Sequence, residues 1–228
     1  KYSENAGLLA LRQAIARYLA RTEGLSYDPA SQIVVTPGAM GALFLALKVL
    51  LNPGDEVIVN EPCWTNYIQQ IRMCGGVPVS VKTDAQRGFD LDVSAVAEAI
   101  TSKTKAIILN SPCNPTGAVA SAETLSQLAK LAQERDLVVL ADEVYKHILF
   151  DGRTYTGFAT LPGMKERTLV IDSLSKTYAM TGWRLGYAVG PHEIIDPMTK
   201  LHQYAIMSSP TMAQYAATEA LKNGDDDI

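Results

Sequence analysis

The chain is poor in cysteine, in long apolar runs and in clustered positive charge, and each shortage argues against a class of protein. Its three cysteines, Cys63, Cys74 and Cys113, are an odd number without the spacing of metal ligands. They predict reduced thiols in a cytoplasmic protein, with neither stapling disulfides nor a metal site. No apolar stretch reaches the roughly 18 residues of a membrane helix, and no signal peptide is visible. The net charge of −4, without long basic runs, makes nucleic acid and anionic membranes poor partners.

What the chain does have is enough apolar sequence for a sizeable core. Of its 228 residues, 47% are hydrophobic and 19% charged, which is typical of a globular protein. It begins at Lys1 without Met and opens directly into a helical pattern, so we expect it to be less than a complete gene product. No repeat or flexible linker divides it, which predicts one domain over residues 1–228. From Pro191 onward the pattern is helical only, and we expect residues 191–228 to lead toward an absent small domain.

Apolar runs of strand length alternate with helix-like segments along the chain. Most of these runs are nearly continuous in Val, Ile and Leu, which is typical of strands covered on both faces. The alternation predicts an α/β fold, a doubly wound, mostly parallel sheet of seven strands with helices on both faces. The expected strands are 33–36, 56–60, 77–81, 106–110, 137–141, 169–172 and 185–189.

The most informative segment, residues 173–184, follows one of these strands. Lys176 lies just past the strand end, where its amine could form an imine with a carbonyl compound. Ser173, Ser175 and Arg184 supply donors suited to a phosphate. Together they predict a covalently held, phosphorylated aldehyde, for which pyridoxal phosphate is the obvious candidate. The alternative is a solvated lysine in a serine-rich turn.

Other polar residues follow the ends of other strands, where ligands bind in a doubly wound sheet. Asn114 lies in a proline-stiffened turn and either donates to a cofactor oxygen or forms an Asx turn. Asp142 leaves a buried strand and could pair with a protonated pyridine nitrogen or cap the next helix. Tyr145 would lie near Asp142 if a helix begins there. Trp64 could stack on a flat ring or belong to the core.

A turn of small residues, 36–41, links the first strand to a helix. Its backbone N–H groups could approach a phosphate, and the helix dipole would favour the anion. Such turns are common, and a purely structural role stays open for this one.

In combination these motifs resemble those of the fold type I pyridoxal phosphate enzymes, specifically the class I/II aminotransferases such as aspartate aminotransferase. The matching segments are Asn114-Pro-Thr-Gly117, Asp142-Glu-Val-Tyr145, Ser173-x-Ser-Lys176 and Gly182-Trp-Arg184-x-Gly186, with Pro37-Gly38 and Pro62-x-Trp64. The resemblance covers essentially the whole chain. It implies the large domain of a transferase that moves an amino group between an amino acid and a 2-oxo acid, with aspartate and 2-oxoglutarate as the default pair.

The resemblance also implies roles for individual residues. Lys176 would bind pyridoxal phosphate as a Schiff base and later move the substrate's proton. Asp142 would pair with the pyridine nitrogen, and Tyr145 and Asn114 would hydrogen-bond the phenolic oxygen. Trp64 would stack on the ring. The expected phosphate contacts are Ser173, Ser175, Arg184 and the turn formed by Gly38, Ala39 and Met40.

Tyr2 falls where members of that family place a tyrosine that reaches the phosphate of the neighbouring subunit. This implies a homodimer with shared active sites, although a plain surface role for Tyr2 stays open. Two departures from the family pattern matter. Met40 replaces a frequent hydroxyl or lysine, so the phosphate would rely more on backbone groups and Arg184. The small domain with the arginine for the substrate's α-carboxylate is also missing, so the isolated chain should transaminate poorly.

Two other functions remain open at this level. The same scaffold in relatives supports a carbon–sulfur lyase, and it can serve as the effector-sensing domain of a transcriptional regulator. Outside the predicted site, His147, His192 and His202 share no spacing, and we expect them to be packing or surface residues. We expect Glu143 to face structural neighbours rather than substrate.

Overall fold

The computed structural model describes residues 2–228 and contains a seven-stranded sheet. Its spatial order is β1-β7-β6-β5-β4-β2-β3. All neighbouring pairs are parallel except those made by β7, which runs antiparallel to both β1 and β6. The strands are β1 Ile33–Thr36, β2 Glu56–Glu61, β3 Val77–Lys82, β4 Thr104–Asn110, β5 Val138–Asp142, β6 Thr168–Ser173 and β7 Gly186–Val189. The predicted strands and the mostly parallel sheet are therefore confirmed.

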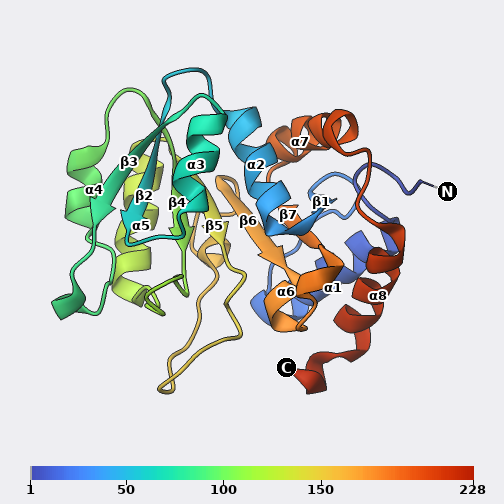
Figure 1. Cartoon of the computed structure of the whole chain (residues 1–228). Coiled ribbons are helices and arrows are strands. Elements are labelled where there is room, and N and C mark those ends of the chain that lie inside the picture. The colour runs from blue at the N-terminus through green and yellow to red at the C-terminus, as the bar shows by residue number, and fades with distance from the viewer. Residues whose placement is uncertain (1) are drawn as a thin grey trace.

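Helices cover both faces of this sheet, as expected for a doubly wound fold (Figure 1). Helices α2, α3 and α7 pack on one face, whereas α1 and α8 lie side by side on the other, next to α4 and α5. The helices are α1 Leu9–Glu23, α2 Gly38–Leu50, α3 Asn66–Met73, α4 Val93–Ala99, α5 Ala122–Glu134, α6 Leu174–Thr177, α7 His192–Ala205 and α8 Thr211–Asn223. Among residues 2–228, no helix has both the length and the apolar character that crossing a membrane requires.

Alternate residues of the strands enter separate cores because successive side chains of a strand point to opposite faces. In β2, Val57 and Val59 join the α2 side, and Ile58 joins the α5 side. In β6, Ile171 lies on the α2 side and Val170 on the α1 side. The central strands are buried on both faces, and this is why their sequences are apolar without alternation.

The structure decides between the alternatives left open for Asp142. Residues 144–147 form a turn and not a helix, and the Asp142 carboxylate accepts from Val144 N (3.4 Å) inside that turn, so Asp142 does not cap a helix. The acidic end of the chain is a 3₁₀ helix, Asp225–Asp227. Asp225 forms an ion pair with Arg21 and accepts a hydrogen bond from Tyr178, which draws this end onto α1.

The start of β7 lies against the start of α2 with no space between them. A Cβ atom added at Gly186 would lie 2.5 Å from Ala39 N and 2.5 Å from the Gly38 carbonyl carbon. Only glycine lets the two backbones come this close. This contact sets the position of the α2 N-terminus relative to the loop that carries Arg184.

We predict that Gly186→Ala lowers the free energy of unfolding by about 1–3 kcal/mol, because the added methyl group must push two backbones apart. Urea denaturation measures the change. Gly182→Ala is the matched control, since a Cβ atom there meets nothing within 4 Å. Equal losses in the two variants would show that the close contact does not matter.

Candidate active site

A cavity of about 350 Å³ opens at the carboxyl ends of β4, β5 and β6, beside the N-terminus of α2. All of the predicted site residues except Tyr2 and Gly38 line it. Tyr2 is 81% exposed and lies outside the lining. The lining residues are Ala39, Met40, Trp64, Tyr67, Asn114, Asp142, Val144, Tyr145, Ser173, Ser175, Lys176, Thr181 and Arg184.

One end of the cavity is built to receive an anion. Helix α2 starts at Gly38 without any side chain capping its first N–H groups, so these donors are free for a ligand. The Arg184 guanidinium lies against this helix start, because a Cβ atom at Gly38 would meet Arg184 Nη2 at 2.8 Å. Arg184 Nη1 also donates to Thr181 O (2.9 Å), which orients the guanidinium. Gly38 thus belongs to the site through its backbone, although it does not line the cavity.

Two serines shape the turn that carries Lys176. Ser173 is the N-cap of α6, and its hydroxyl oxygen accepts from Ser175 N (3.1 Å). This bond uses the hydroxyl as an acceptor, so its hydrogen remains available for donation to an anion. The cap therefore fixes the backbone of α6 and leaves a donor at the cavity wall.

Lys176 projects from α6 into the cavity. Its Nζ atom lies 5.5 Å from the centre of the Tyr145 ring. The amine forms no ion pair with any carboxylate in residues 2–228. An amine without a counter-ion in a lined cavity is free for covalent chemistry with a carbonyl compound.

The Asp142 carboxyl group, at the end of β5, lines the same cavity as Lys176. It is 4% exposed, accepts from Tyr67 Oη (2.7 Å), and has no cationic partner among the described residues. Burial raises the pKa of Asp142 to about 6, and the Tyr67 hydrogen bond acts against that rise. A buried carboxylate of this kind is suited to a cationic ligand group.

Three residues that line the cavity were not predicted from the sequence, namely Val144, Thr181 and Tyr67, and Tyr67 is the one that contacts a predicted site residue through its side chain. It lies in the first turn of α3, three residues after Trp64, and burial raises the pKa of its phenol well above the usual value. It therefore remains a hydrogen-bond donor to Asp142. No local signal pointed to Tyr67, because its partner Asp142 is 75 residues away in sequence.

An amide and a phenol form a pair on the adjacent wall. Asn114 Nδ2 donates to Tyr145 Oη (3.3 Å), while the Asn114 backbone N–H donates to Asn110 Oδ1 (2.8 Å). The Asn114 side chain thus faces Tyr145 and does not close an Asx turn. Trp64 packs edge-on against Tyr67, with ring centres 5.5 Å apart, and presents itself to the cavity.

Glu143 and the three histidines, which were expected to have packing or surface roles, all lie outside the cavity lining. Glu143 is 3% exposed and accepts from Phe158 N (3.3 Å), away from the cavity. His202 is fully buried, with Nδ1 on Asn5 O, and His147 Nε2 contacts Tyr18 Oη. None of the three histidines lines the cavity.

These features fit pyridoxal phosphate at each of its functional groups. A phosphate matches the free N–H groups of α2 together with Arg184, and a protonated pyridine nitrogen matches the partnerless Asp142. The aldehyde matches the unpaired amine of Lys176. Fold and site therefore define a protein of the class that binds a phosphorylated aldehyde on a doubly wound sheet.

Comparison with known proteins agrees with that class. The family model described as aminotransferase class I and II matches residues 1–228, and the chain belongs to this family. Enzymes of this family depend on pyridoxal phosphate and act on amino and 2-oxo acids.

Relatives of known name resemble the chain along nearly its whole length. It is 49% identical to the putative aminotransferase YugH of Bacillus subtilis and 44% identical to the aspartate/prephenate aminotransferase of Thermus thermophilus. These matches cover 100% and 98% of this chain but only 58% and 57% of the relatives. The chain thus spans less than two thirds of their length.

Solved structures also match this chain over nearly its whole length, while the chain covers only part of each of them. The aromatic aminotransferase of Pyrococcus horikoshii superposes with a TM-score of 0.96 at 40% identity, covering 100% of this chain and 62% of that one. The Thermus thermophilus aspartate aminotransferase with maleate gives 0.95 at 43% identity, covering 99% and 58%.

The raised pKa of Asp142 predicts that the folding stability of the cofactor-free protein depends on pH. Its pKa is 3.8 when unfolded and about 6 when folded, so the folded protein is favoured below pH 4 and loses that advantage as the pH rises through 6. Ionised Asp142 costs roughly 3 kcal/mol at pH 8. Asp142→Asn should therefore stabilise the cofactor-free protein by about 1–3 kcal/mol at pH 8 and much less at pH 4.

Urea denaturation at the two pH values checks this. Asp136→Asn is the control, because that side chain is 95% exposed and its replacement should give no gain at pH 8. A gain from Asp142→Asn that is equal at both pH values would contradict the assignment of a strained carboxylate.

Proposed function

We propose that the protein catalyses the pyridoxal phosphate-dependent transfer of an amino group between an amino acid and a 2-oxo acid. The observation that carries the proposal is one cavity lined both by an amine, Lys176, and by a buried carboxylate, Asp142, neither of which forms an ion pair within residues 2–228. The aminotransferase names of the relatives support it. Aspartate with 2-oxoglutarate is the default pair, since several relatives are named aspartate aminotransferases.

The residues that line the cavity are each proposed to hold one part of the cofactor. Asp142 pairs with the pyridine nitrogen, and Tyr67 keeps that carboxylate oriented. Asn114 and Tyr145, already joined by a hydrogen bond, hold the phenolic oxygen. Trp64 covers one face of the ring. The proposed phosphate contacts are Ser173, Ser175, Arg184 and the backbone of Gly38, Ala39 and Met40.

The bound cofactor supplies an electron sink for the substrate's α-carbon. The chain's own contribution is to hold and move protons near that carbon. Lys176 Nζ would hold the cofactor through its aldehyde carbon, with loss of water, and as a free amine it would accept and return the substrate's α-proton. The centre of the Tyr145 ring lies 5.5 Å from Lys176 Nζ and restricts the conformations that the lysine side chain can adopt. Ionised Asp142 keeps the opposite end of the ring protonated.

Three further features belong to the proposal. Residues 1–228 would form the large, cofactor-binding domain, which is consistent with their 58% share of the relatives' length. Tyr2, exposed and outside its own cavity, would reach the phosphate of a second subunit in a homodimer. The free thiols of Cys63, Cys74 and Cys113 favour a cytoplasmic location.

An amino-donor screen tests the function directly. The full-length, cofactor-loaded protein is mixed with single amino acids, and the absorbance change from the aldehyde to the amine form of the cofactor is followed. We expect conversion by aspartate in the absence of an acceptor and recovery on adding 2-oxoglutarate. Pyruvate release from cysteine-type substrates without an acceptor would instead indicate a carbon–sulfur lyase.

We predict that Lys176→Ala removes the borohydride-reducible bond to pyridoxal phosphate and lowers the transamination rate by at least about 10²–10⁴-fold, because both the covalent link and the proton carrier are lost. Mass spectrometry after reduction and a coupled rate assay measure the two effects. Lys130→Ala, at a side chain 79% exposed on α5, is the control. Retention of the reducible bond in Lys176→Ala would show that another amine is the nucleophile.

A further inference from the structure

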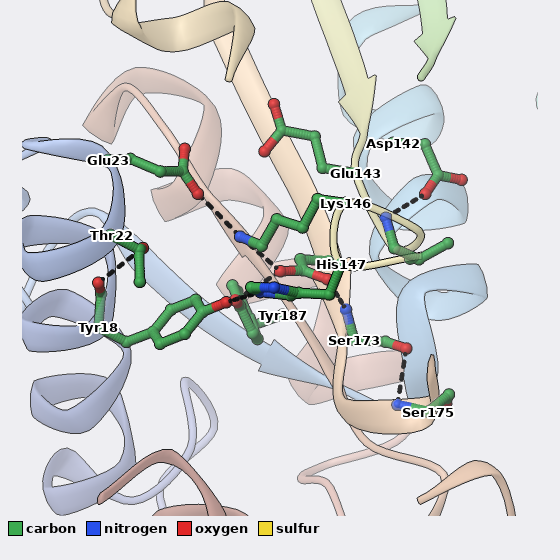
Figure 2. A network of polar contacts seen from close by, with 12 residues as sticks. Tyr18, Thr22, Glu23, Asp142, Glu143, Lys146, His147, Ser173, Ser175 and Tyr187 are labelled. Carbon is green, nitrogen blue, oxygen red and sulfur yellow. Dashed lines mark hydrogen bonds and ion pairs between the residues drawn. The ribbon is translucent and has the colours of Figure 1, made fainter. Parts of the chain in front are cut away.

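A buried ionic cluster of Lys146, Glu23 and Asp172 lies on the α1 side of the sheet, and Figure 2 shows the contact between Lys146 and Glu23. Lys146 Nζ lies 2.8 Å from Glu23 Oε1 at the end of α1 and 3.0 Å from Asp172 Oδ2 in β6. The three side chains are only 3%, 6% and 3% exposed, respectively. No motif used for the function includes Lys146 or Glu23.

The cluster is charged and well connected. Burial alone would lower the pKa of Lys146, but the carboxylates of Asp172 and Glu23 and the neighbouring tyrosines raise it well above its usual value, so it stays a cation. Tyr187 Oη donates to Asp172 Oδ2 (2.8 Å), which ties β7 to the cluster. A buried ion pair with this many partners fixes the groups that carry it, because a displaced charge would be left without compensation.

The same two segments that enter this cluster also enter the cavity. Lys146 follows Tyr145 in the turn after β5, and Tyr145 lines the cavity. Asp172 precedes Ser173 in β6, and successive strand residues face opposite sides of a sheet. Asp172 Oδ1 also accepts from Ser173 N (2.7 Å), at the cap of the helix that carries Lys176.

We propose that Lys146 is a positioning residue, whose ion pair with Asp172 holds the Tyr145 turn and the Ser173–Lys176 turn at their working separation. Lys146 is adjacent in sequence to Tyr145, and Asp172 is adjacent to Ser173, so the ion pair joins two segments that each carry a cavity residue. A shift of about 1 Å between a reacting group and its neighbours costs up to about 10²-fold in rate. The ion pair to Glu23 has a different effect, since it ties the cluster to α1 and reaches no cavity residue.

This inference rests on the proposed function, since Tyr145 and Lys176 matter only if they hold the cofactor. The wild-type titration separates the two ideas. If wild-type protein does not bind pyridoxal phosphate, the proposed function fails. If it binds and the variants below do not differ from one another, only the positioning role fails.

The sharpest test compares Asp172→Asn with Glu23→Gln. Both replace a buried carboxylate by its isosteric amide, and both remove one counter-ion from the same ammonium group. Apoprotein is titrated with pyridoxal phosphate, and thermal denaturation is recorded for each variant. We expect Asp172→Asn to weaken pyridoxal phosphate binding about tenfold, on the scale known for groups that orient a binding residue from behind. Glu23→Gln should lower the melting temperature comparably but keep the affinity within about twofold.

Two Lys146 variants complete the test. Lys146→Arg keeps the charge and should restore binding to within about threefold of wild type, whereas Lys146→Met should match or exceed the loss in Asp172→Asn. In the cofactor-loaded enzyme, Asp172→Asn should lower kcat with little change in KM, since the disturbed groups act in the chemical step. Should Lys146→Met fail to fold, the Asp172→Asn and Glu23→Gln pair still decides. Equal loss of affinity in those two variants, or no loss in either, would overturn the proposal.

Discussion

The site depends on one constraint, a carboxylate buried at the end of β5 without a cation of its own. Asp142 is 4% exposed, and the hydrogen bonds from Tyr67 and Val144 N only partly replace the water that it has lost. Its raised pKa expresses this cost. The fold tolerates Asp142 because β5 is held between β4 and β6 and because Asn110 Nδ2 donates to the Asp142 carbonyl oxygen (3.0 Å). A ligand that carries a positive charge to this point offsets the cost, and so binding and stability are linked through this group.

The turn after β5 separates two electrostatic environments that differ in kind. On the cavity side, neither Asp142 nor Lys176 has an ionic partner within residues 2–228, which keeps both available for a ligand. On the α1 side, Lys146 is surrounded by Glu23 and Asp172 and is fully compensated (Figure 2). Buried charges that have counter-ions hold their neighbours rigidly in place, whereas charged groups without counter-ions remain free to interact with a ligand. The two lie within a few residues of each other along the chain because alternate residues at the strand ends face opposite sides of the sheet.

Most of the fold and much of the site could be predicted from the sequence. Strands such as β4 and β6 can be recognised in the sequence as continuous apolar runs. The edge of the sheet that binds ligands can also be predicted, because the carboxyl ends of parallel strands lie together there. Asp142, Asn114 and Lys176 could therefore be expected to converge, and they do line one cavity. Whether a helix begins after Asp142 stayed open, because the local sequence carries no signal that distinguishes a turn from a helix there. Tyr67 and Lys146 were not assigned to the site or its support, since their partners are 75 and 123 residues away in sequence.

Residue type and periodicity along the chain were enough to predict the strands, their burial on both faces and the side chains at their ends. Which charges have counter-ions and which do not depends instead on contacts between segments distant in sequence. Glu23, at the end of α1, meets Lys146 because α1 packs across β6 and β7, and nothing near residue 23 in the sequence encodes that meeting. The free energy of a charge in a protein is set by the groups around it in space, and those groups are brought together only when the sheet has formed.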